Sequence, residues 1–310
     1  MEHYVTLFDS RFLPQGLALQ SSLERHAGPY ALWILCVDDE TYDVLGRLGL
    51  PNVRLMRLVD VETPELLRAK QERSRAEYCW TLTPFTPRFV FEADPTVQRA
   101  TYLDADLWLR QSPAPIFREF ELSGKQVLIT DHAYAREHDQ TTTSGRYCVQ
   151  FMIFTREGGE RVRKWWEERC VEWCFARVEN GKFGDQRYLD DWPERFGDRV
   201  HVLQHAEWAR APWNAAQSPY DQALFFHFHG LRLLGDDRVN LGGYPLSRSL
   251  ITHVYSPYLD QLGQAVGALR RLGVEPKVQQ QNSVLLALKN LLFSAFPQRR
   301  RFVIMPLQMH

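Results

Sequence analysis

Residues 100–108 read ATYLDADLW, and this stretch decides the fold class. The apolar run Ala100–Leu103 has the composition of a buried strand, and Asp104 and Asp106 close it with one small residue between them. Because the chain begins to turn at a strand end, these two carboxylates can point into one crevice. Parallel α/β sheets bind ligands at the carboxyl ends of their strands, and two hard oxygen donors there suit Mg²⁺ or Mn²⁺ bound to a diphosphate. The alternative is a solvated turn that binds nothing.

The N-terminal part of the chain alternates apolar runs with helical patterns. The run ALWILCV at 31–37 is typical of a strand buried on both faces of a parallel sheet. We expect strands at 4–8, 31–37 and 53–58, and helices at 13–26 and 42–48. This β-α-β-α-β order predicts the opening of a doubly wound α/β sheet.

Further along the chain, strands and helices continue to alternate before the pattern becomes more helical. We expect a charged helical segment at 65–91 that Pro84 and Pro87 break, strands at 127–130 and 147–155, and helices at 159–178, 259–272 and 279–296. The sequence therefore predicts one catalytic domain over residues 1–240 and a helical C-terminal extension over residues 241–310.

The composition excludes several classes of protein. The 310 residues are 45% hydrophobic and 24% charged, with a formal net charge of −1. This is globular composition without the basic excess of a nucleic-acid-binding protein, so we expect no nucleic acid partner. No apolar run approaches the roughly 18 residues of a membrane span, and the start, MEHY, does not read as a secretory signal. Five scattered cysteines indicate reduced thiols and a cytoplasmic protein.

The C-terminal tail interleaves apolar and basic residues. The stretch KNLLFSAF at 289–296 precedes RRRF at 299–302. This pattern favours peripheral contact with the anionic inner face of a membrane. The alternative is a helix that caps the domain beside a solvated basic patch.

Four further motifs accompany the diaspartate in a defined order. FDS at 8–10 ends the first strand and VDD at 37–39 ends the second, whereas GDQ at 184–186 and HFHG at 227–230 come later. With DAD at 104–106, these motifs resemble those of the GT-A glycosyltransferases, in particular the retaining family-eight type that includes lipopolysaccharide galactosyltransferases and glycogenin. The resemblance covers residues 4–235 and implies the Rossmann-like GT-A fold of nucleotide-diphospho-sugar transferases.

The resemblance implies roles for the residues of these motifs. The implied metal ligands are Asp104, Asp106 and His227. His229 would share a strand face with His227 and is the competing ligand, and a packed histidine is the alternative for either. Asp185 and Gln186 are implied to lie beside the reacting sugar carbon as catalytic residues, although Asp185 would also fit a helix N-cap. The implied donor contacts are Phe8, Asp9, Asp38, Asp104, Ala105 and Gly230.

Two segments depart from the family pattern. LRLL at 231–234 stands where the family has Lys-Pro-Trp, so Arg232 is the candidate for a phosphate contact. VQF at 149–151 stands where the family has Asn-Ser-Gly, so Gln150 is the candidate for a donor contact. These differences indicate a divergent bacterial subgroup.

Two further contacts are expected from their positions. Arg73 belongs to a polar helical stripe in a region that contacts the donor in the resembling enzymes, so we expect it to bind phosphate or sugar. A solvated helix face is the alternative for this stripe. Trp213 and Asn214 are expected on the acceptor side because aromatic faces suit sugar rings, and a core tryptophan is the alternative.

Taken with the resemblance, the residues predict a metal-dependent hexosyltransferase. It would move a hexose from a nucleotide-diphosphate sugar, with a UDP-sugar favoured, to a glycan or lipid-linked acceptor such as lipopolysaccharide or another surface glycan. The resemblance implies retention of configuration, with the donor sugar, the linkage and the oligomeric state left open. One alternative is a non-catalytic glycan- or nucleotide-binding protein of the same fold. The other is a sugar-nucleotide nucleotidyltransferase, whose usual Gly-rich N-terminal loop does not occur at residues 8–14.

Overall fold

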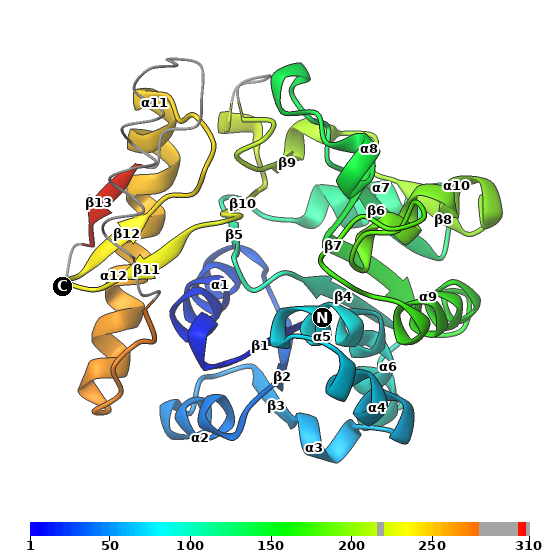
Figure 1. Cartoon of the computed structure of the whole chain (residues 1–310), viewed down its shortest axis with the longest axis horizontal. Helices are drawn as coiled ribbons and strands as arrows, with labels where there is room; N and C mark the ends of the chain where they lie inside the picture. The colour runs from blue at the N-terminus through cyan, green and yellow to red at the C-terminus, as the bar shows by residue number, and fades with distance from the viewer. Residues whose placement is uncertain (216–219, 279–302, 308–310) are drawn as a thin grey trace.

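A seven-stranded sheet forms the centre of the molecule, in the order β3-β2-β1-β4-β7-β6-β8 (Figure 1). The computed structural model describes residues 1–215, 220–278 and 303–307. The strands of this sheet are β1 (Glu2–Phe8), β2 (Tyr30–Cys36), β3 (Val53–Arg57), β4 (Arg99–Leu103), β6 (Val127–Asp131), β7 (Tyr147–Thr155) and β8 (Val200–Val202). Only β7 runs antiparallel to its neighbours in this sheet. The predicted α/β class and its β-α-β-α-β opening are confirmed.

Helices surround the sheet, and two small sheets extend it. The α-helices are α1 (Leu13–His26), α2 (Asp39–Leu48), α3 (Leu58–Val61), α4 (Pro64–Glu72), α5 (Arg75–Leu82), α6 (Thr86–Ala93), α7 (Ala114–Ser123), α8 (Thr141–Ser144), α9 (Glu160–Glu172), α10 (Trp192–Arg195), α11 (Arg248–Leu250) and α12 (Ser256–Arg271). One small sheet joins β5 (Leu107–Leu109), β10 (Phe225–His227) and β9 (Ala209–Arg210). The other joins β11 (Arg232–Leu234), β12 (Arg238–Asn240) and β13 (Ile304–Pro306).

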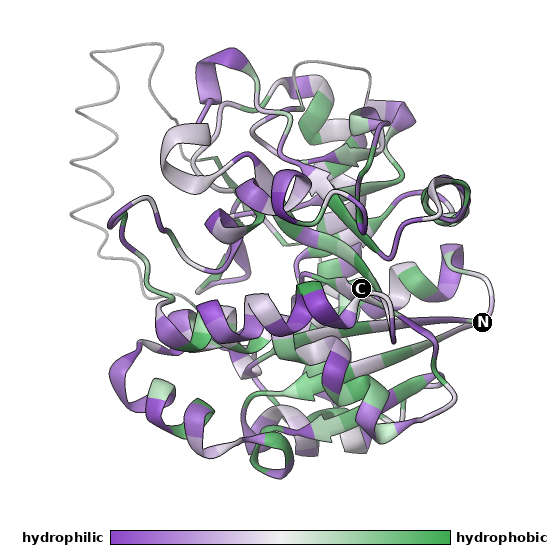
Figure 2. Ribbon diagram, turned by 90° about the vertical axis from the view of Figure 1, so that its right-hand side faces the viewer, coloured by the Kyte–Doolittle hydropathy of each residue, from purple (hydrophilic) through white to green (hydrophobic). Residues whose placement is uncertain are grey.

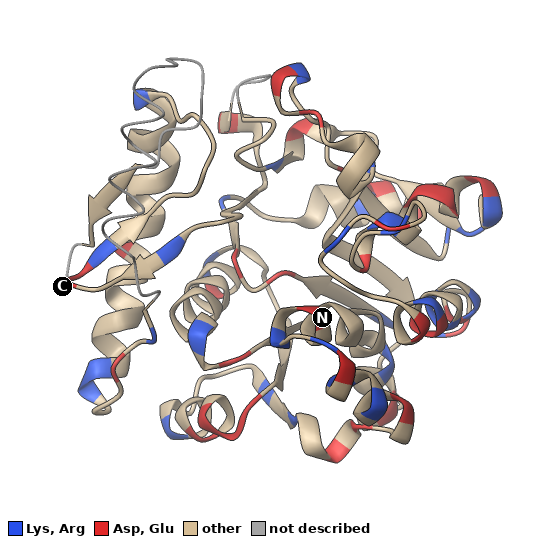
Figure 3. Ribbon diagram, viewed as in Figure 1, with Lys and Arg blue, Asp and Glu red and all other residues tan. Residues whose placement is uncertain are grey.

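The central strands are apolar on both faces because each face has its own hydrophobic core. In β2, Leu32 and Ile34 belong to the core that includes α1, whereas Trp33 and Leu35 belong to the core that includes α6 and α9. This alternation follows the period of two along a strand. Figure 2 shows the apolar strands in the interior and more polar residues on the surrounding helices. On an outer helix such as α9, acidic and basic residues are interspersed (Figure 3).

Two predicted helices end earlier than expected. The segment 65–91 is interrupted not only near its prolines but also at Arg73, which is extended, and at Ser74, whose side chain forms a capping box with Glu77 at the start of α5. The helix expected over 159–178 ends at Glu172, because Trp173 adopts an extended conformation. The sequence pattern missed both boundaries, since polar and apolar periodicity continues across them.

The described part of the C-terminal region folds back onto the domain. α12 packs against α1, and β13 pairs with β12, so residues after 240 contribute to the same body. Within the described residues, no helix combines the length and apolar character that crossing a membrane requires. The helix expected at 279–296 and the tail expected to contact a membrane, 289–302, lie outside the described residues.

Candidate active site

The diaspartate lies where the central sheet gives way to the first small sheet. β4 ends at Leu103, and the backbone N–H of Asp104 still donates to Gln150 O at 3.0 Å. The chain then turns tightly, with the N–H of Leu107 donating to Asp104 O at 3.1 Å, before β5 begins. Both aspartates therefore project from the carboxyl end of a central strand, where α/β sheets bind their ligands.

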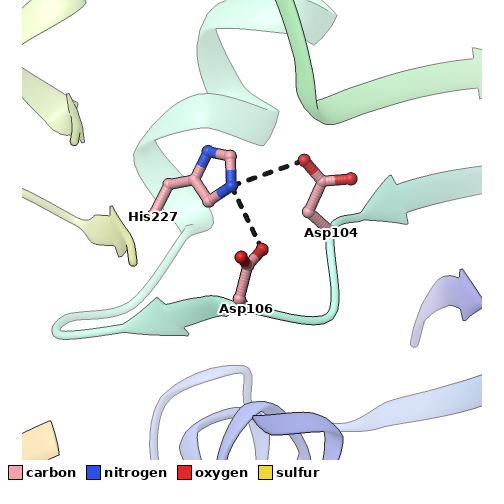
Figure 4. Close-up of side chains that lie close together, drawn as sticks. All are labelled: Asp104, Asp106 and His227. Carbon is pink, nitrogen blue, oxygen red and sulfur yellow. Dashed lines mark ion pairs between the residues drawn. The ribbon is translucent and has the colours of Figure 1, made fainter. Parts of the chain in front are cut away.

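Strand register brings a histidine to the diaspartate. β10 pairs antiparallel with β5 so that His227 lies opposite Leu107, and the N–H of Phe228 donates to Asp106 O at 2.9 Å. His227 Nε2 consequently lies 3.1 Å from Asp106 Oδ1 and 3.7 Å from Asp104 Oδ2 (Figure 4). The three residues offer one ligand atom each within 4.8 Å of one another, which is close enough to hold one metal ion. In the described part of the chain, this group contains His227 and does not contain His229.

A buried hydrogen-bond chain fixes the orientation of the His227 ring. The Thr130 hydroxyl donates to Cys148 O at 3.3 Å, so its oxygen accepts from Gln150 Nε2 at 3.4 Å. This orients the Gln150 amide so that Oε1 accepts from His227 Nδ1 at 3.0 Å. In a neutral imidazole the Nε2 lone pair then faces the two carboxylates, as in metal sites whose histidine is held by an outer hydrogen bond. The donor set therefore fits a divalent cation.

The electrostatics of the group favour a positive charge between the two aspartates. Burial alone would raise the pKa of Asp106, but the facing His227 imidazole holds it well below its ordinary value. Burial alone would lower the pKa of His227, but the charges of Asp106 and Asp104 raise it well above its ordinary value. The imidazole and the Asp106 carboxylate thus stabilise each other's charged form, and a bound cation would take over the role of the imidazolium.

We call Asp104, Asp106 and His227 the metal-binding group, since they could hold one metal ion. This group opens into a cavity of about 500 Å³. This volume is within the usual range for small-molecule sites. The residues that line the cavity include Phe8, Asp9, Arg11, Phe12, Arg75, Asp104, Ala105, Asp106, Asp185, Gln186, Trp213, His227 and Arg232. Most of the side chains that the sequence predicted therefore come together around one space, although they are far apart in the chain.

The two predicted catalytic residues lie in this cavity. Asp185 is only 3% exposed, and its Oδ2 has no hydrogen-bond partner among the described residues. Burial, reinforced by the charge of Asp104, raises the pKa of Asp185 to about 8. The Gln186 Nε2 donates to Ser144 O at 2.7 Å, so the amide oxygen is available to a ligand. A buried carboxyl oxygen without a partner is costly, which points to a role in binding.

Arg73 does not line the cavity, contrary to the expectation from its helical stripe. Its side chain is buried, and its guanidinium donates to Thr81 Oγ1 and to Val171 O, both at 2.6 Å. The break between α4 and α5 turns Arg73 inward. Arg75, two residues later, lines the cavity instead and pairs with both Asp9 and Asp38.

Four other predicted contacts are absent from the cavity lining and have structural partners. Asp38 caps α2 and accepts from Ser10 Oγ at 2.8 Å. Gln150 is fully buried behind His227, so the structure contradicts the direct donor contact expected for it. Asn214 donates to His132 O at 2.9 Å from a buried position, and Gly230 forms a turn with a positive φ of 80°. These four residues therefore hold neighbouring parts of the structure in place and do not line the cavity themselves.

Three residues that line the cavity carry no direct signal in the sequence pattern. Tyr134 and Tyr244 lie in irregular segments, and Cys148 lies within β7. All five cysteines are free, as expected for reduced thiols, with four buried and Cys79 partly exposed. Arg75 was accessible to sequence reasoning in principle, because the capping box SRAE at 74–77 marks the helix start that precedes it.

No protein-family profile matches the chain. The galactosyltransferase LgtC, solved with donor and acceptor sugar analogs, superposes with a TM-score of 0.53 at 13% identity, covering 84% of this chain and 95% of that chain. The chain therefore has the GT-A glycosyltransferase fold, and the predicted fold is confirmed.

Sequence comparison identifies nearer relatives. The chain belongs to the same protein family as YfnD of Bacillus subtilis, with 30% identity over 278 residues, 83% of this chain and 87% of that protein. YfnF of the same organism is 28% identical over 290 residues, 88% of this chain and 95% of that protein. Both relatives are described as uncharacterized proteins, so the function must be argued from the site.

Proposed function

We propose that this protein is a metal-dependent glycosyltransferase that moves a hexose from a nucleoside-diphosphate sugar, a UDP-sugar by preference, to a glycan or lipid-linked acceptor. The observation that carries the proposal is the group Asp104, Asp106 and His227, which opens into a cavity of about 500 Å³ at the carboxyl end of β4 in a GT-A fold. The predicted alternative of a binding protein without activity would use the same cavity, and the release of UDP measured below separates the two.

The cation would be Mn²⁺ or Mg²⁺, held by the two carboxylates and by His227 Nε2. Hard oxygen donors with one imidazole suit these ions. When bound, the cation supplies Lewis-acid stabilisation of the diphosphate leaving group. The protein's own part is to hold His227 in place through Gln150 and to keep the two aspartates at the strand end.

The nucleotide would lie along the charged part of the cavity. Phe8 and Asp9 end β1 there, and Ala105 lies between the metal ligands, so these residues are the proposed nucleoside contacts. Arg75 and Arg232 line the same cavity and carry the positive charge that a diphosphate requires. Arg232 lies over the Phe12 ring at 5.2 Å, which fixes its side chain on this side. It would replace the phosphate-binding lysine that the family pattern has nearby.

Asp185 and Gln186 would contact the donor sugar. A carboxyl whose pKa is raised to about 8 is a poor nucleophile near neutral pH but a good hydrogen-bond partner for a sugar hydroxyl. The Gln186 amide oxygen would stabilise positive charge at the anomeric carbon. Retention then follows if the acceptor hydroxyl attacks from the face that the diphosphate leaves, with a leaving phosphate oxygen taking the hydroxyl proton.

The placement in the cell and the division of the chain are part of the same proposal. Free cysteines support a cytoplasmic protein, and a lipid-linked acceptor would bring it to the inner face of the membrane.

Residues 1–240 would form the catalytic domain, and residues 241–310 would form an extension that packs on it through α12.

The test is release of UDP from UDP-glucose, UDP-galactose and UDP-N-acetylglucosamine, with Mn²⁺ and with chelator. We expect the wild type to release UDP from one donor only when the metal is present. Asp185→Asn should reduce this rate about 100-fold, since it removes a group beside the reacting sugar. The matched control is Asp191→Asn, because Asp191 pairs with Arg195 and does not line the cavity. Absence of UDP release from every donor would support the non-catalytic alternative.

A further inference from the structure

The lysine that follows α12 makes two contacts with the N-terminal half of the chain. Lys277 Nζ donates to Ser10 Oγ at 2.7 Å and forms an ion pair with the Glu40 carboxylate. Ser10 directly follows Asp9, which lines the cavity, whereas neither Ser10 nor Lys277 lines it. A residue of the C-terminal extension therefore contacts the chain one residue away from a proposed nucleoside contact.

The chain between α12 and Lys277 is held in place by its own contacts. The N–H of Val274 donates to Leu269 O at 3.0 Å, and the Val274 side chain packs against the core that includes α1. From α2, the Arg47 guanidinium donates to Leu272 O. These contacts keep Lys277 beside the turn between β1 and α1.

Ser10 connects Lys277 to the arginine that is proposed to bind the diphosphate. The Ser10 hydroxyl donates to Asp38 Oδ2 at 2.8 Å, and Arg75 donates to the same oxygen. Since a serine hydroxyl has one hydrogen, the oxygen that gives it to Asp38 can only accept from Lys277. Lys277, Ser10, Asp38 and Arg75 therefore form one chain of hydrogen bonds, which we call the lysine–arginine chain.

The carboxylate in the middle of the lysine–arginine chain keeps its charge. Burial alone would raise the pKa of Asp38, but hydrogen bonds from Thr41 and Ser10 lower it to about 2. The negative charge of Asp38 is balanced by Arg75, which also pairs with Asp9. Two carboxylates therefore share the Arg75 guanidinium in the nucleotide-free protein.

Binding of a diphosphate would draw Arg75 away from these carboxylates and into the cavity that it lines. Separating a guanidinium from a partly buried carboxylate costs free energy, because the remaining charge loses its partner. Lys277 does not line the cavity, so it would remain beside Ser10 and keep the hydroxyl directed at Asp38. Its positive charge would thereby lower the cost of freeing Arg75.

We propose that Lys277 is a positioning residue for the donor: it holds Ser10 against Asp38 and so allows Arg75 to exchange its carboxylate partners for the donor diphosphate. This inference rests on the proposed function, because it concerns how the same site binds its nucleotide. It also gives the C-terminal extension a part in donor binding. The alternative is a contact that only fastens the end of α12 to the turn after β1.

The experiment measures the affinity for UDP with Mn²⁺ by calorimetry. Lys277→Met keeps the aliphatic part of the side chain and removes the charge, so we expect the affinity to fall about fivefold. Lys277→Arg restores a cation that donates hydrogen bonds and should stay within about twofold of wild type. Lys125→Met is the matched control, because Lys125 donates to Gly197 O at 2.7 Å and does not line the cavity.

A second background separates positioning of Arg75 from a direct nucleotide contact and from a purely structural role. In the Arg75→Ala protein, Lys277→Met should change UDP affinity less than about twofold, because the residue through which Lys277 acts is already absent. An equal loss of affinity in both backgrounds would overturn the inference. A lower free energy of unfolding in Lys277→Met with unchanged UDP affinity would overturn it as well.

The outcomes also separate this inference from the proposed function. If the wild type and Lys277→Met bind UDP equally while both require Mn²⁺, the inference is wrong and the proposed function stands. If the wild type binds UDP neither with Mn²⁺ nor without it, the proposed function is wrong and the inference falls with it.

Discussion

Gln150 Oε1 lies 3.0 Å from His227 Nδ1, and this contact sets which face of the imidazole meets the two aspartates. Both residues are buried, and the opposite end of the Gln150 amide is held by Thr130. A residue expected to contact the donor therefore acts one step behind the metal-binding group. Its effect should appear in metal affinity rather than in direct sugar recognition.

Replacing Gln150 tests this positioning role. Gln150→Leu removes the acceptor of the His227 N–H, so we expect the affinity for Mn²⁺ to fall about tenfold. Gln150→Glu keeps an acceptor and should retain Mn²⁺ affinity within about threefold of wild type. Calorimetric titration of the metal-free protein measures both values. Unchanged Mn²⁺ affinity in Gln150→Leu would show that the contact does not orient the ligand.

Arg73 and Arg75 should behave differently although they are two residues apart. Arg73→Ala leaves buried polar groups without partners, so we expect the free energy of unfolding to fall by about 2 kcal/mol. Arg75→Ala removes a half-exposed guanidinium that pairs with Asp9 and Asp38, and it should weaken UDP binding about tenfold. Urea denaturation and calorimetry measure these two quantities. The assignment fails if Arg73→Ala, rather than Arg75→Ala, selectively weakens UDP binding in the folded protein.

Asp185 should make the metal-free protein less stable as pH rises. Its folded pKa of about 8 exceeds the ordinary value of 3.8, so between these values the folded state binds more protons than the unfolded state. Stability therefore falls with rising pH across this range, and asparagine, which does not ionise, removes this dependence. We expect Asp185→Asn to stabilise the protein by on the order of 2 kcal/mol at pH 8 and by much less at pH 5.

Urea denaturation in chelator at both pH values measures this difference. Asp191→Asn serves as the control, because Asp191 is partly exposed and paired with Arg195. Parallel pH profiles for wild type and Asp185→Asn would mean that Asp185 ionises normally in the fold. Stabilisation combined with lost UDP release would indicate that the carboxyl is kept for activity at a cost in stability.

The sequence predicted those strands whose two faces are both buried, because such strands are apolar at every position. The run at 31–37 is apolar throughout because each face of β2 has its own core, and the strand forms within one residue of the expected bounds. The helix expected to reach residue 178 ends at Glu172, because tertiary packing places Trp173 in an extended conformation. The spacing of apolar residues along the sequence does not reveal where such a helix ends.

The site was predictable where the position of a residue along a strand determines which way its side chain points. Asp104 and Asp106 follow a strand end, and the register of β5 with β10 brings His227 to them. Motif order pointed to this group but left His229 open as the competing residue. The prediction that Arg73 contacts the donor was wrong, because the break between α4 and α5 determines which way its side chain points. Tyr134 and Tyr244 were missed because they meet only through tertiary contacts between irregular segments.

The most direct test of the central claim is calorimetric binding of UDP with Mn²⁺ and with chelator. We predict that the wild type binds UDP with Mn²⁺, that chelator reduces the affinity at least about tenfold, and that Asp106→Ala abolishes the dependence on metal. Asp60→Ala is the control, because Asp60 is exposed on α3 and away from the cavity lining. Equal binding of UDP with and without metal, or identical behaviour of Asp106→Ala and wild type, would contradict the account.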